Sequence, residues 1–408
     1  MRGDPRRRCR PIGGRRATVA LPGRRTRRLI SLVALAGPHH VLLVPGFFGF
    51  ANLGDFTYFG HVRELLAEVG PAEGLDGEIR VVFTEPSSAL PRRAALLAEA
   101  IHRLLDQRGG VVSIVGHSTG ALDARLMLAP GSLLQTRVDV ERCAAAVRGV
   151  VGVAAPHHGT PLAQHFTSLF GAQLLKLLSL ATVYSLRTGR LPMGVALRLA
   201  RLLRRSDSSP TGVVDQLFLQ LLSDFAGKRR RAIEQFFSRV HSDQGVIPQL
   251  APRAMELFNS ATADRPGVRY GEVVTRARPP GLRSLTRAGF SGYAQTTHAL
   301  YVVLYRLARG RPTDPPGRLS TEHRKFLRRA YGSVPDHRAN DGIVPTLSQV
   351  RGQLVAAVWA DHHDVLGHFH KPRHVPPHFD WVASGTGFDR EHFEVVWKAV
   401  ARFLGAAA

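Results

Sequence analysis

Short apolar runs alternate with amphipathic stretches along the first 160 residues of the chain. The apolar runs are rich in β-branched residues and predict buried strands at residues 40–44, 78–83, 111–115 and 147–153. Between them, two stretches repeat their apolar residues with helical spacing and are followed by glycine, at residues 60–69 and 91–105. Strands that alternate with helices at this spacing predict a parallel, doubly wound sheet and therefore an α/β fold.

The pattern changes after residue 161. Residues 162–262 read as helical, with no apolar run of the same strand quality. Within them, 174–186 is almost wholly apolar, and 191–205 is apolar on one side and rich in arginine on the other. The segment is a helical subdomain packed on the sheet, a lid that shields an apolar cleft, or both; its amphipathic pattern favours the lid. Residues 206–210 predict a flexible break inside it.

The sheet pattern resumes after this insertion. Residues 268–274 and 354–359 predict two further strands, and 299–308 and 389–404 predict helices. The Pro-, Gly- and Arg-rich stretch at 276–287 predicts a loop. The whole pattern is that of one large domain with a helical insertion.

The domain boundaries and the charge distribution coincide. We expect an α/β domain over residues 39–408, a helical lid insertion at 162–262, and an Arg-rich, disordered tail at 1–38. The chain carries 55 lysines and arginines, a net charge of +24, and eleven of the arginines lie in residues 1–28. Such charge attracts nucleic acids and anionic membranes. No helix-turn-helix, zinc-finger spacing or aromatic-interleaved basic strand accompanies it, so we expect no nucleic-acid partner and attribute the charge to an arginine-preferring composition.

The cysteines and the N-terminal segment bear on the cellular compartment. The two cysteines, Cys9 and Cys143, exclude a disulfide framework and a Cys-based zinc site. Basic residues at 24–28 precede an apolar stretch that is too short and begins too late for a clean signal peptide. No uninterrupted apolar span has the length of a transmembrane helix. This slightly favours a cytoplasmic protein over an exported one.

The most informative motif lies at residues 111–120, which read V-V-S-I-V-G-H-S-T-G and precede a helix-prone segment. A strand, a sharp turn with a serine, and a helix form the nucleophile-elbow pattern. Gly116 and Gly120 lack the Cβ atoms that would collide where strand and helix are forced close. Ser118 then takes a strained conformation that pushes its Oγ into a cleft. The alternative is a glycine-rich strand–helix turn with an incidental serine.

A serine nucleophile needs a base and a carboxylate that fixes the tautomer of the base. In α/β-hydrolases these follow the serine in the order Asp, His, in loops after late strands. Asp341, in N-D-G-I-V-P, and His362, in the loop after the last predicted strand, fit this order. The tripeptide at 340–342 can also be only a turn, and His363 is the alternative base.

Two backbone N–H groups hold the oxyanion in such a fold. One belongs to the residue after the nucleophile, here Thr119, and the other to the loop after the first strand, here Phe47. Because the backbone supplies both donors, their side chains are unconstrained. The sequence therefore locates this pair without testing it.

Five motifs stand at the places just described: V-L-L-V-P-G-F-F-G, V-G-H-S-T-G, A-P-H-H-G-T-P-L-A, N-D-G-I-V-P and D-H-H-D-V. Together they resemble the bacterial triacylglycerol lipase family of α/β-hydrolases, from about residue 40 to residue 404. The resemblance implies a catalytic triad of Ser118, Asp341 and His362. It also implies that the insertion after Pro161 corresponds to the lid of the family.

Two details of the resemblance bear on the site. The family often has a histidine before the glycine of the oxyanion loop, whereas Pro45 stands there in this chain, so that side chain's support of the loop is absent. The histidine loop of the family reads H-x-D, and its aspartate helps to bind a structural calcium. His362-His363-Asp364 matches, which supports His362 as the base and implies Asp364 as a calcium ligand. A carboxylate there can equally cap the loop or pair with an arginine.

A cluster of histidines lies in the C-terminal part of the chain: His362, His363, His368, His370, His374 and His378. Imidazoles are ligands for transition metals. The spacing matches no standard zinc pattern, so we expect a solvated, partly packed segment here.

These observations predict a serine esterase or lipase that acts on carboxylic esters with long acyl chains through an acyl-enzyme. The chemistry itself requires no cofactor. The expected partners are a lipid or ester substrate and, through the lid, a lipid surface in transient contact. One alternative keeps the triad in an acyltransferase or thioesterase. The other is a catalytically idle protein of the same fold that binds lipid or an acidic surface through its arginines.

Overall fold

The computed structural model describes residues 37–47, 58–85, 87–188, 191–203, 211–227, 230–231, 233–235, 245–310, 319–371 and 373–407. The tail predicted at 1–38 lies outside the described residues except for its last two positions. The break predicted at 206–210 lies outside them entirely. Residues 37–408 form one compact unit.

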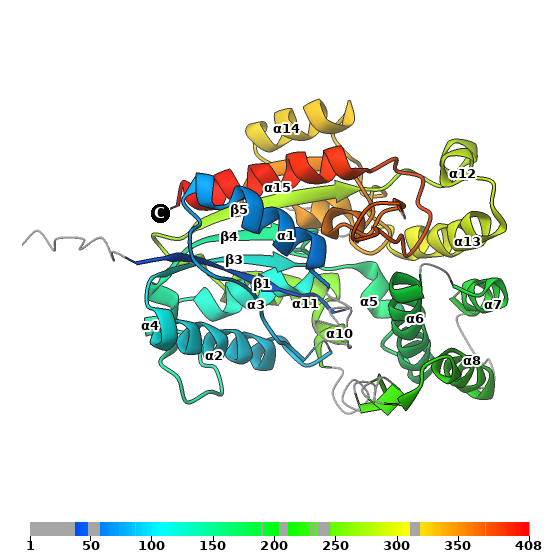
Figure 1. Cartoon of the computed structure of the whole chain (residues 1–408), viewed down its shortest axis with the longest axis horizontal. Coiled ribbons are helices and arrows are strands. Elements are labelled where there is room, and N and C mark those ends of the chain that lie inside the picture. The colour runs from blue at the N-terminus through cyan, green and yellow to red at the C-terminus, as the bar shows by residue number, and fades with distance from the viewer. Residues whose placement is uncertain are drawn as a thin grey trace, which may run out of the picture. The chain divides into compact units, whose positions relative to one another are not determined.

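A single six-stranded sheet lies at the centre of the described chain (Figure 1). Its strands are β1 (His39–Val44), β2 (Ile79–Val81), β3 (Val111–His117), β4 (Val147–Val153), β5 (Arg269–Arg276) and β6 (Gln353–Trp359). They lie in the order β2-β1-β3-β4-β5-β6, and every neighbouring pair is parallel. The chain adds β2 on one side of β1 and the remaining strands on the other. The predicted parallel, doubly wound sheet is confirmed.

Helices cover both faces of this sheet (Figure 1). One layer contains α1 (Gly60–Val69), the short η1 (Pro71–Glu73) and α15 (Arg390–Gly405), and the other contains α2 (Leu90–Arg108), α3 (Thr119–Leu128) and α4 (Val140–Ala145). Alternate residues of β1 face the two layers: Val41 and Leu43 pack with α1 and α15, whereas Leu42 and Val44 pack with α2 and α3. A strand buried on both faces must be apolar at every position, which explains the continuous apolar runs of the sequence.

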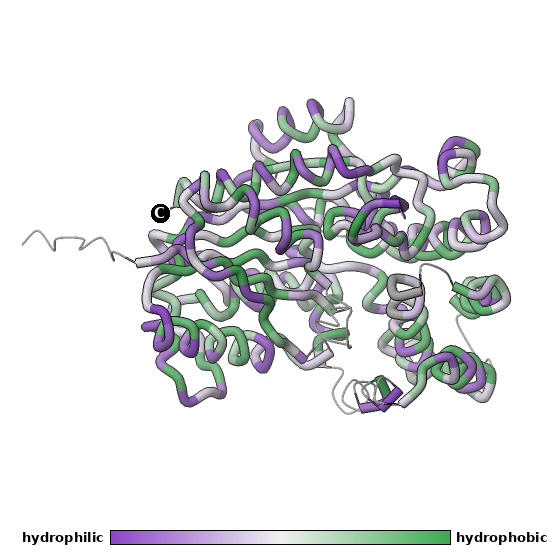
Figure 2. Tube along the Cα trace, in the orientation of Figure 1, coloured by the Kyte–Doolittle hydropathy of each residue, from purple (hydrophilic) through white to green (hydrophobic). Residues whose placement is uncertain are grey.

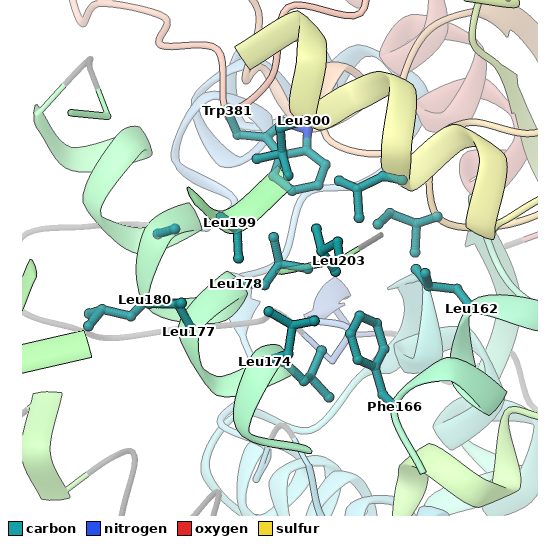
Figure 3. Close-up of a cluster of buried hydrophobic side chains, with 14 of the residues drawn as sticks. Leu162, Phe166, Leu174, Leu177, Leu178, Leu180, Leu199, Leu203, Leu300 and Trp381 are labelled. Atoms are coloured by element: carbon teal, nitrogen blue, oxygen red, sulfur yellow. The ribbon is translucent and has the colours of Figure 1, made fainter. Parts of the chain in front are cut away.

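The described residues between β4 and β5 are helical. The helices are α5 (Pro161–His165), α6 (Leu169–Thr188), α7 (Met193–Leu203), α8 (Thr211–Ser223), α10 (Val246–Gln249) and α11 (Pro252–Ala261). Figure 3 shows Leu178 and Leu203 of this insertion gathered with Leu300 of α13 (Gly292–Leu307) and with Trp381. The insertion therefore has its own leucine-rich core, which is continuous with the end of the domain. Its role as a lid stays a prediction.

The loop predicted at 276–287 is wrong in its second half, because residues 282–288 form α12 (Leu282–Ala288). The two prolines and Gly281 suggested irregular structure throughout. These residues instead directly precede a helix. At its start, Ser284 Oγ accepts a hydrogen bond from the N–H of Gly281 at 2.9 Å. The helix expected at 299–308 also begins earlier than predicted, at Gly292.

Helix α14 (Thr321–Tyr331) was not predicted. Ser320 caps it, because its hydroxyl accepts a hydrogen bond from the N–H of His323 at 3.1 Å. Its few apolar residues, Leu327 among them, pack against β5 and β6, and the rest of its surface is polar. Figure 2 shows this contrast between α14 and the mainly hydrophobic strands. The remaining short elements are η2 (Thr346–Gln349) and η3 (Asp364–Leu366).

The described helices include none that combines the length and the apolar character needed to cross a membrane.

An aromatic stack fastens the irregular segment after η3 to α1. His61 of α1 stacks on His378 with 3.8 Å between ring centroids, and Phe369 covers the opposite face of His378 at 4.3 Å. Nδ1 of His378 lies 2.6 Å from the carbonyl oxygen of Gly367. Among the described residues no three histidines converge as metal ligands. His61, Phe369 and His378 are thus packed together, whereas His370 is exposed.

The stack makes stability depend on pH. Burial, with smaller contributions from His368, Arg390 and His374, lowers the pKa of His61 from 6.5 to about 4. As the pH falls below 6.5, the unfolded chain therefore binds a proton at His61 before the folded chain does. The free energy of unfolding contributed by this group is lost between pH 6.5 and about 4, and it is fully present above pH 6.5. In His61→Phe the ring stack remains and this proton is removed. The free energy of unfolding should then depend on pH less steeply, by up to about 1.4 kcal/mol per pH unit.

Urea denaturation between pH 6.5 and pH 4.5 measures this slope. The matched control is His370→Gln, a change at an exposed histidine of the same segment. Equal slopes for His61→Phe and the wild type would contradict the prediction.

Candidate active site

Ser118 lies at the sharp turn between β3 and α3. Its backbone is left-handed, with φ 54° and ψ −124°, a conformation that L-residues other than glycine rarely adopt. A Cβ at Gly116 would lie 2.3 Å from the backbone nitrogen of Ala121, and one at Gly120 would lie 2.2 Å from the carbonyl oxygen of Val44. Only glycine fits at both positions, so the helix approaches the strands closely and holds Ser118 in the strained turn.

Asp341 and His362 form a buried pair. Nδ1 of His362 lies 2.8 Å from Oδ2 of Asp341, and both residues are at most 1 % exposed. The carboxylate also accepts hydrogen bonds from the N–H groups of Ile343 and Val344 at 2.9 Å and 2.7 Å, and from the hydroxyl of Thr275 at 2.8 Å. A hydrogen bond from Nδ1 of His362 to the carboxylate places the ring proton on Nδ1, which leaves Nε2 as the acceptor nitrogen.

The loop with His362 contacts the residue that precedes Ser118. Nε2 of His117 lies 2.9 Å from the carbonyl oxygen of His362, and their ring centroids are 4.7 Å apart. His363, the alternative base, packs instead against Trp381 with 4.8 Å between ring centroids. The structure thus places the pair of Asp341 and His362 next to the residue that precedes Ser118, and it packs His363 against Trp381.

An apolar cleft opens at Ser118. It is lined by Phe47, Ser118, Pro156, Thr160, Leu162, Ala163, Phe166, Leu175, Ile247, Leu250, Ile343 and Val344. Half of these residues belong to the helical insertion, where they lie on α5, α6 and α10 or directly after α5 and α10. The insertion and the sheet therefore share the surface around the serine hydroxyl.

The loop after β1 also reaches Ser118. A Cβ at Gly46 would lie 2.6 Å from Cβ of Ser118 and 3.2 Å from its Oγ, so the loop lies directly against the serine. Phe47 follows and lines the cleft, while Thr119 is the first residue of α3. The two segments predicted to supply oxyanion donors thus flank the same hydroxyl.

Arg93 of α2 supports this loop, and the sequence analysis missed it. Its guanidinium donates to the carbonyl oxygen of Pro45 at 2.8 Å and pairs with Asp123 of α3 at 2.7 Å. Both side chains are fully buried, and burial raises the pKa of Asp123 to about 6 against the opposing effect of Arg93. A buried ion pair thus holds the loop after β1 at the carbonyl oxygen of Pro45. An arginine on the otherwise apolar face of 91–105 was the available signal.

Three carboxylates converge beside the His362 loop. Oxygen atoms of Asp361, Asp364 and Asp380 all lie within 4.8 Å of one another, with the first two buried. Burial raises the pKa of all three carboxyls, to about 6 for Asp361. Repulsion from Asp361 also raises the pKa of Asp364, and repulsion from Asp361 and Asp364 raises that of Asp380. No described lysine or arginine forms an ion pair with them. A hydrogen bond from the side chain of Ser384 opposes this rise in the pKa of Asp361.

This donor set fits a hard cation, because Ca²⁺ prefers carboxylate oxygens. Of the three ligands the sequence predicted only Asp364. Asp361 stands beside His362 in the same motif and could have been found from it. Asp380 lies sixteen residues after Asp364, across an irregular segment, and no local pattern connects it to the site.

Comparison with known proteins gives one curated relative. No protein-family model matches the chain. A triacylglycerol lipase from Pseudomonas fragi is 30% identical over 131 residues, which are 32% of this chain and 39% of the relative. The match thus spans well under half of the relative's length.

Three solved structures are similar in chain path. A metagenomic carboxyl esterase is 18% identical, covering 94% of this chain and 80% of its own, with a TM-score of 0.45. Lipase 1 from Pelosinus fermentans is 17% identical, covering 81% of this chain and 94% of its own, with a TM-score of 0.47. The Staphylococcus hyicus lipase is 14% identical, covering 91% of this chain and 97% of its own, with a TM-score of 0.48.

The parallel strand order, the left-handed serine between β3 and α3, and the match to the Pseudomonas fragi protein agree with one another. The chain therefore has a doubly wound α/β fold with a serine at the turn between β3 and α3, and part of it is similar to part of a triacylglycerol lipase.

Proposed function

We propose that this protein is a serine carboxylic-ester hydrolase of the lipase type. The observation that carries the proposal is Ser118 in a left-handed turn, in an apolar cleft, beside the buried pair of His362 and Asp341. A nucleophile, a base and an acid that orients the base are the parts that acyl transfer to serine requires. The name of the Pseudomonas fragi relative, a triacylglycerol lipase, supports an ester of a fatty acid as the substrate.

In the proposed reaction, Nε2 of His362 takes the proton of Ser118 as Oγ attacks the ester carbonyl. The carbonyl oxygen becomes an oxyanion, which the N–H groups of Phe47 and Thr119 stabilise. The protonated His362 gives its proton to the departing alcohol, and the acyl-enzyme remains. Water then attacks the acyl carbonyl with His362 again as base, which releases the fatty acid and restores Ser118.

Asp341 has two functions in this reaction. It holds the proton of His362 on Nδ1, so that Nε2 faces the serine, and it stabilises the imidazolium that forms. Its hydrogen bonds from two backbone N–H groups fix the direction of the carboxylate. An asparagine at this position could present its amide N–H to His362 and select the wrong tautomer.

Hydrolysis of p-nitrophenyl esters tests the triad. Ser118→Ala should lower kcat by about 10⁶-fold, because the nucleophile is lost. Asp341→Asn should lower kcat by about 10⁴-fold through the wrong tautomer of His362. Ser260→Ala, at an exposed position of α11, is the control and should retain full activity.

Activity that survives Ser118→Ala would refute this role for the serine. A wild-type protein that transfers the acyl group to an added alcohol or thiol, in preference to water, would show the acyltransferase alternative. Lipid binding without turnover would show the idle alternative.

We further propose that the helical insertion is a lid that meets lipid surfaces. Leu162, Phe166 and Leu175 of the insertion line the cleft at Ser118, so its position sets access to the serine. On the outer side of α7, Met193 and Leu197 are 54% and 43% exposed. Residues 162–206 hold seven basic and no acidic side chains. Exposed apolar residues among basic ones favour attachment to an anionic lipid surface.

A double variant, Met193→Asp with Leu197→Asp, tests the lid. It should lower activity on emulsified long-chain triacylglycerols about 10-fold or more, because charges replace the residues that would enter the lipid. Activity on a soluble short-chain ester should change less than twofold. Val395→Asp is the control, since Val395 is 63% exposed on α15. Equal activity of the double variant and the control on the emulsion would refute the surface role.

We also propose that Asp361, Asp364 and Asp380 bind a structural Ca²⁺. When bound, the ion would neutralise three carboxylates that otherwise repel one another. Asp361 and Asp364 flank His362 and His363, so the ion would stabilise the loop that holds the proposed base. It takes no part in the bond-making steps.

Thermal unfolding in EDTA and in Ca²⁺ tests this site. Ca²⁺ at 100 times its Kd should stabilise the protein by about 2.7 kcal/mol and raise Tm accordingly. Asp380→Asn should abolish the response to Ca²⁺, whereas Asp215→Asn, at an exposed acid of α8, should retain it. A Tm that is independent of Ca²⁺ in the wild type would remove the ion from the account.

A further inference from the structure

A chain of buried hydrogen bonds joins three segments around Ser118. The hydroxyl of Tyr58 lies 2.6 Å from Nδ1 of His117, and Nε2 of His117 lies 2.9 Å from the carbonyl oxygen of His362. The backbone N–H of Gly46 also hydrogen-bonds to the Tyr58 hydroxyl. Tyr58 is 2 % exposed and His117 is 0 % exposed, so water does not compete for these groups.

The chemistry of the groups fixes the direction of every bond in the chain. The carbonyl oxygen of His362 can only accept, so Nε2 of His117 must carry a proton. Burial lowers the pKa of His117 well below its usual range, so the ring is neutral and Nδ1 is an acceptor. The Tyr58 hydroxyl therefore donates to Nδ1 and accepts from the N–H of Gly46. One arrangement of protons satisfies all four groups.

The ends of the chain are the two segments that must meet at Ser118. Gly46 belongs to the loop that lies against the serine, immediately before Phe47. His362 is the residue that pairs with Asp341. His117 is covalently bonded to Ser118 and lies on β3, which is fully buried. Through its ring, both segments are therefore linked by hydrogen bonds to a buried residue directly beside the serine.

We propose that Tyr58 and His117 are positioning residues, which set the distance between the oxyanion loop and His362 on either side of Ser118. This inference rests on the proposed function. Neither side chain lines the cleft, so neither is assigned a contact with the substrate. Their effect is on geometry: a donor or a base displaced by about 1 Å costs on the order of 10²-fold in rate.

The proposal assigns a special role to the Tyr58 hydroxyl. Without it, Nδ1 of His117 has no donor, and Gly46 loses its acceptor in the chain. The neutral imidazole is then free to place its proton on Nδ1, which would turn the lone pair of Nε2 toward the carbonyl oxygen of His362 and repel it. Loss of the hydroxyl should thus disturb both ends of the chain.

Four variants test the proposal: Tyr58→Phe, His117→Phe, the combination of both, and His117→Gln. A glutamine can accept at its Oε1 from Tyr58 and donate its amide N–H to the carbonyl oxygen of His362, so it is the conservative replacement. Steady-state hydrolysis of a p-nitrophenyl ester gives kcat and KM, and thermal unfolding reports stability. In addition, ¹⁵N NMR of the histidine rings reports the tautomer of His117 without use of activity.

Tyr58→Phe and His117→Phe should each lower kcat by about 10–100-fold while KM changes less than twofold, because the reacting geometry and not the cleft is altered. The double variant should be no worse than the more damaged single variant, because both changes break the same chain. His117→Gln should recover at least a tenth of the wild-type kcat. In the wild type, NMR should find His117 neutral with its proton on Nε2.

Three results would overturn the proposal. The first is a wild-type kcat in Tyr58→Phe or in His117→Phe. The second is a double variant whose fold-loss in kcat equals the product of the two single fold-losses. The third is a His117 ring with its proton on Nδ1 or with both nitrogens protonated. If the Phe variants do not fold, the glutamine variant and the wild-type NMR spectrum still decide. If Ser118→Ala loses its activity and Tyr58→Phe keeps the wild-type activity, the proposed function stands and only this inference is refuted.

Discussion

The site depends on one backbone contact, the approach of α3 to β3 and β1 at the turn that holds Ser118. Side chains at Gly116 or Gly120 would lie 2.2–2.3 Å from neighbouring backbone atoms, so the contact exists only because both positions lack a Cβ. The contact forces Ser118 into a left-handed conformation at φ 54°. The strain at the serine is therefore sustained by the packing of a fully buried strand, and not by the turn alone.

Buried polar groups attach the remaining parts of the site to this turn. The ion pair of Arg93 and Asp123 joins α2 and α3 and holds the loop after β1 through the carbonyl oxygen of Pro45. The pair of Asp341 and His362 is likewise buried. Groups of this kind are costly to bury unless they are hydrogen-bonded, and Arg93, Asp123 and Asp341 each form several hydrogen bonds. Their arrangement specifies one geometry around Ser118, whereas apolar packing alone would tolerate several.

The sequence predicted those features that repeat locally or follow a fixed chain order. The apolar runs gave the strands because both faces of the sheet are buried, and Gly116 and Gly120 gave the turn. Asp341 and His362 followed from their order after the serine, and their catalytic roles stay proposals. Tyr58 and Asp380 could not be found in this way, because Tyr58 contacts His117, 59 residues away, and Asp380 meets Asp364, 16 residues away, only through tertiary packing. Arg93 stands out as an arginine on an apolar helix face, but its partner Asp123 is brought to it by the fold. Helix α12 was missed because the Pro-Pro-Gly sequence that indicated a loop stands directly before the helix and not within it.

The account depends most on a reactive serine hydroxyl at position 118. Covalent labelling with a fluorophosphonate, followed by peptide mapping, measures this most directly, since the reagent modifies only serines that a base activates. We predict a single adduct on the peptide that contains Ser118, formed in the native protein and not after denaturation. No adduct, or an adduct on a peptide without Ser118, would contradict the account.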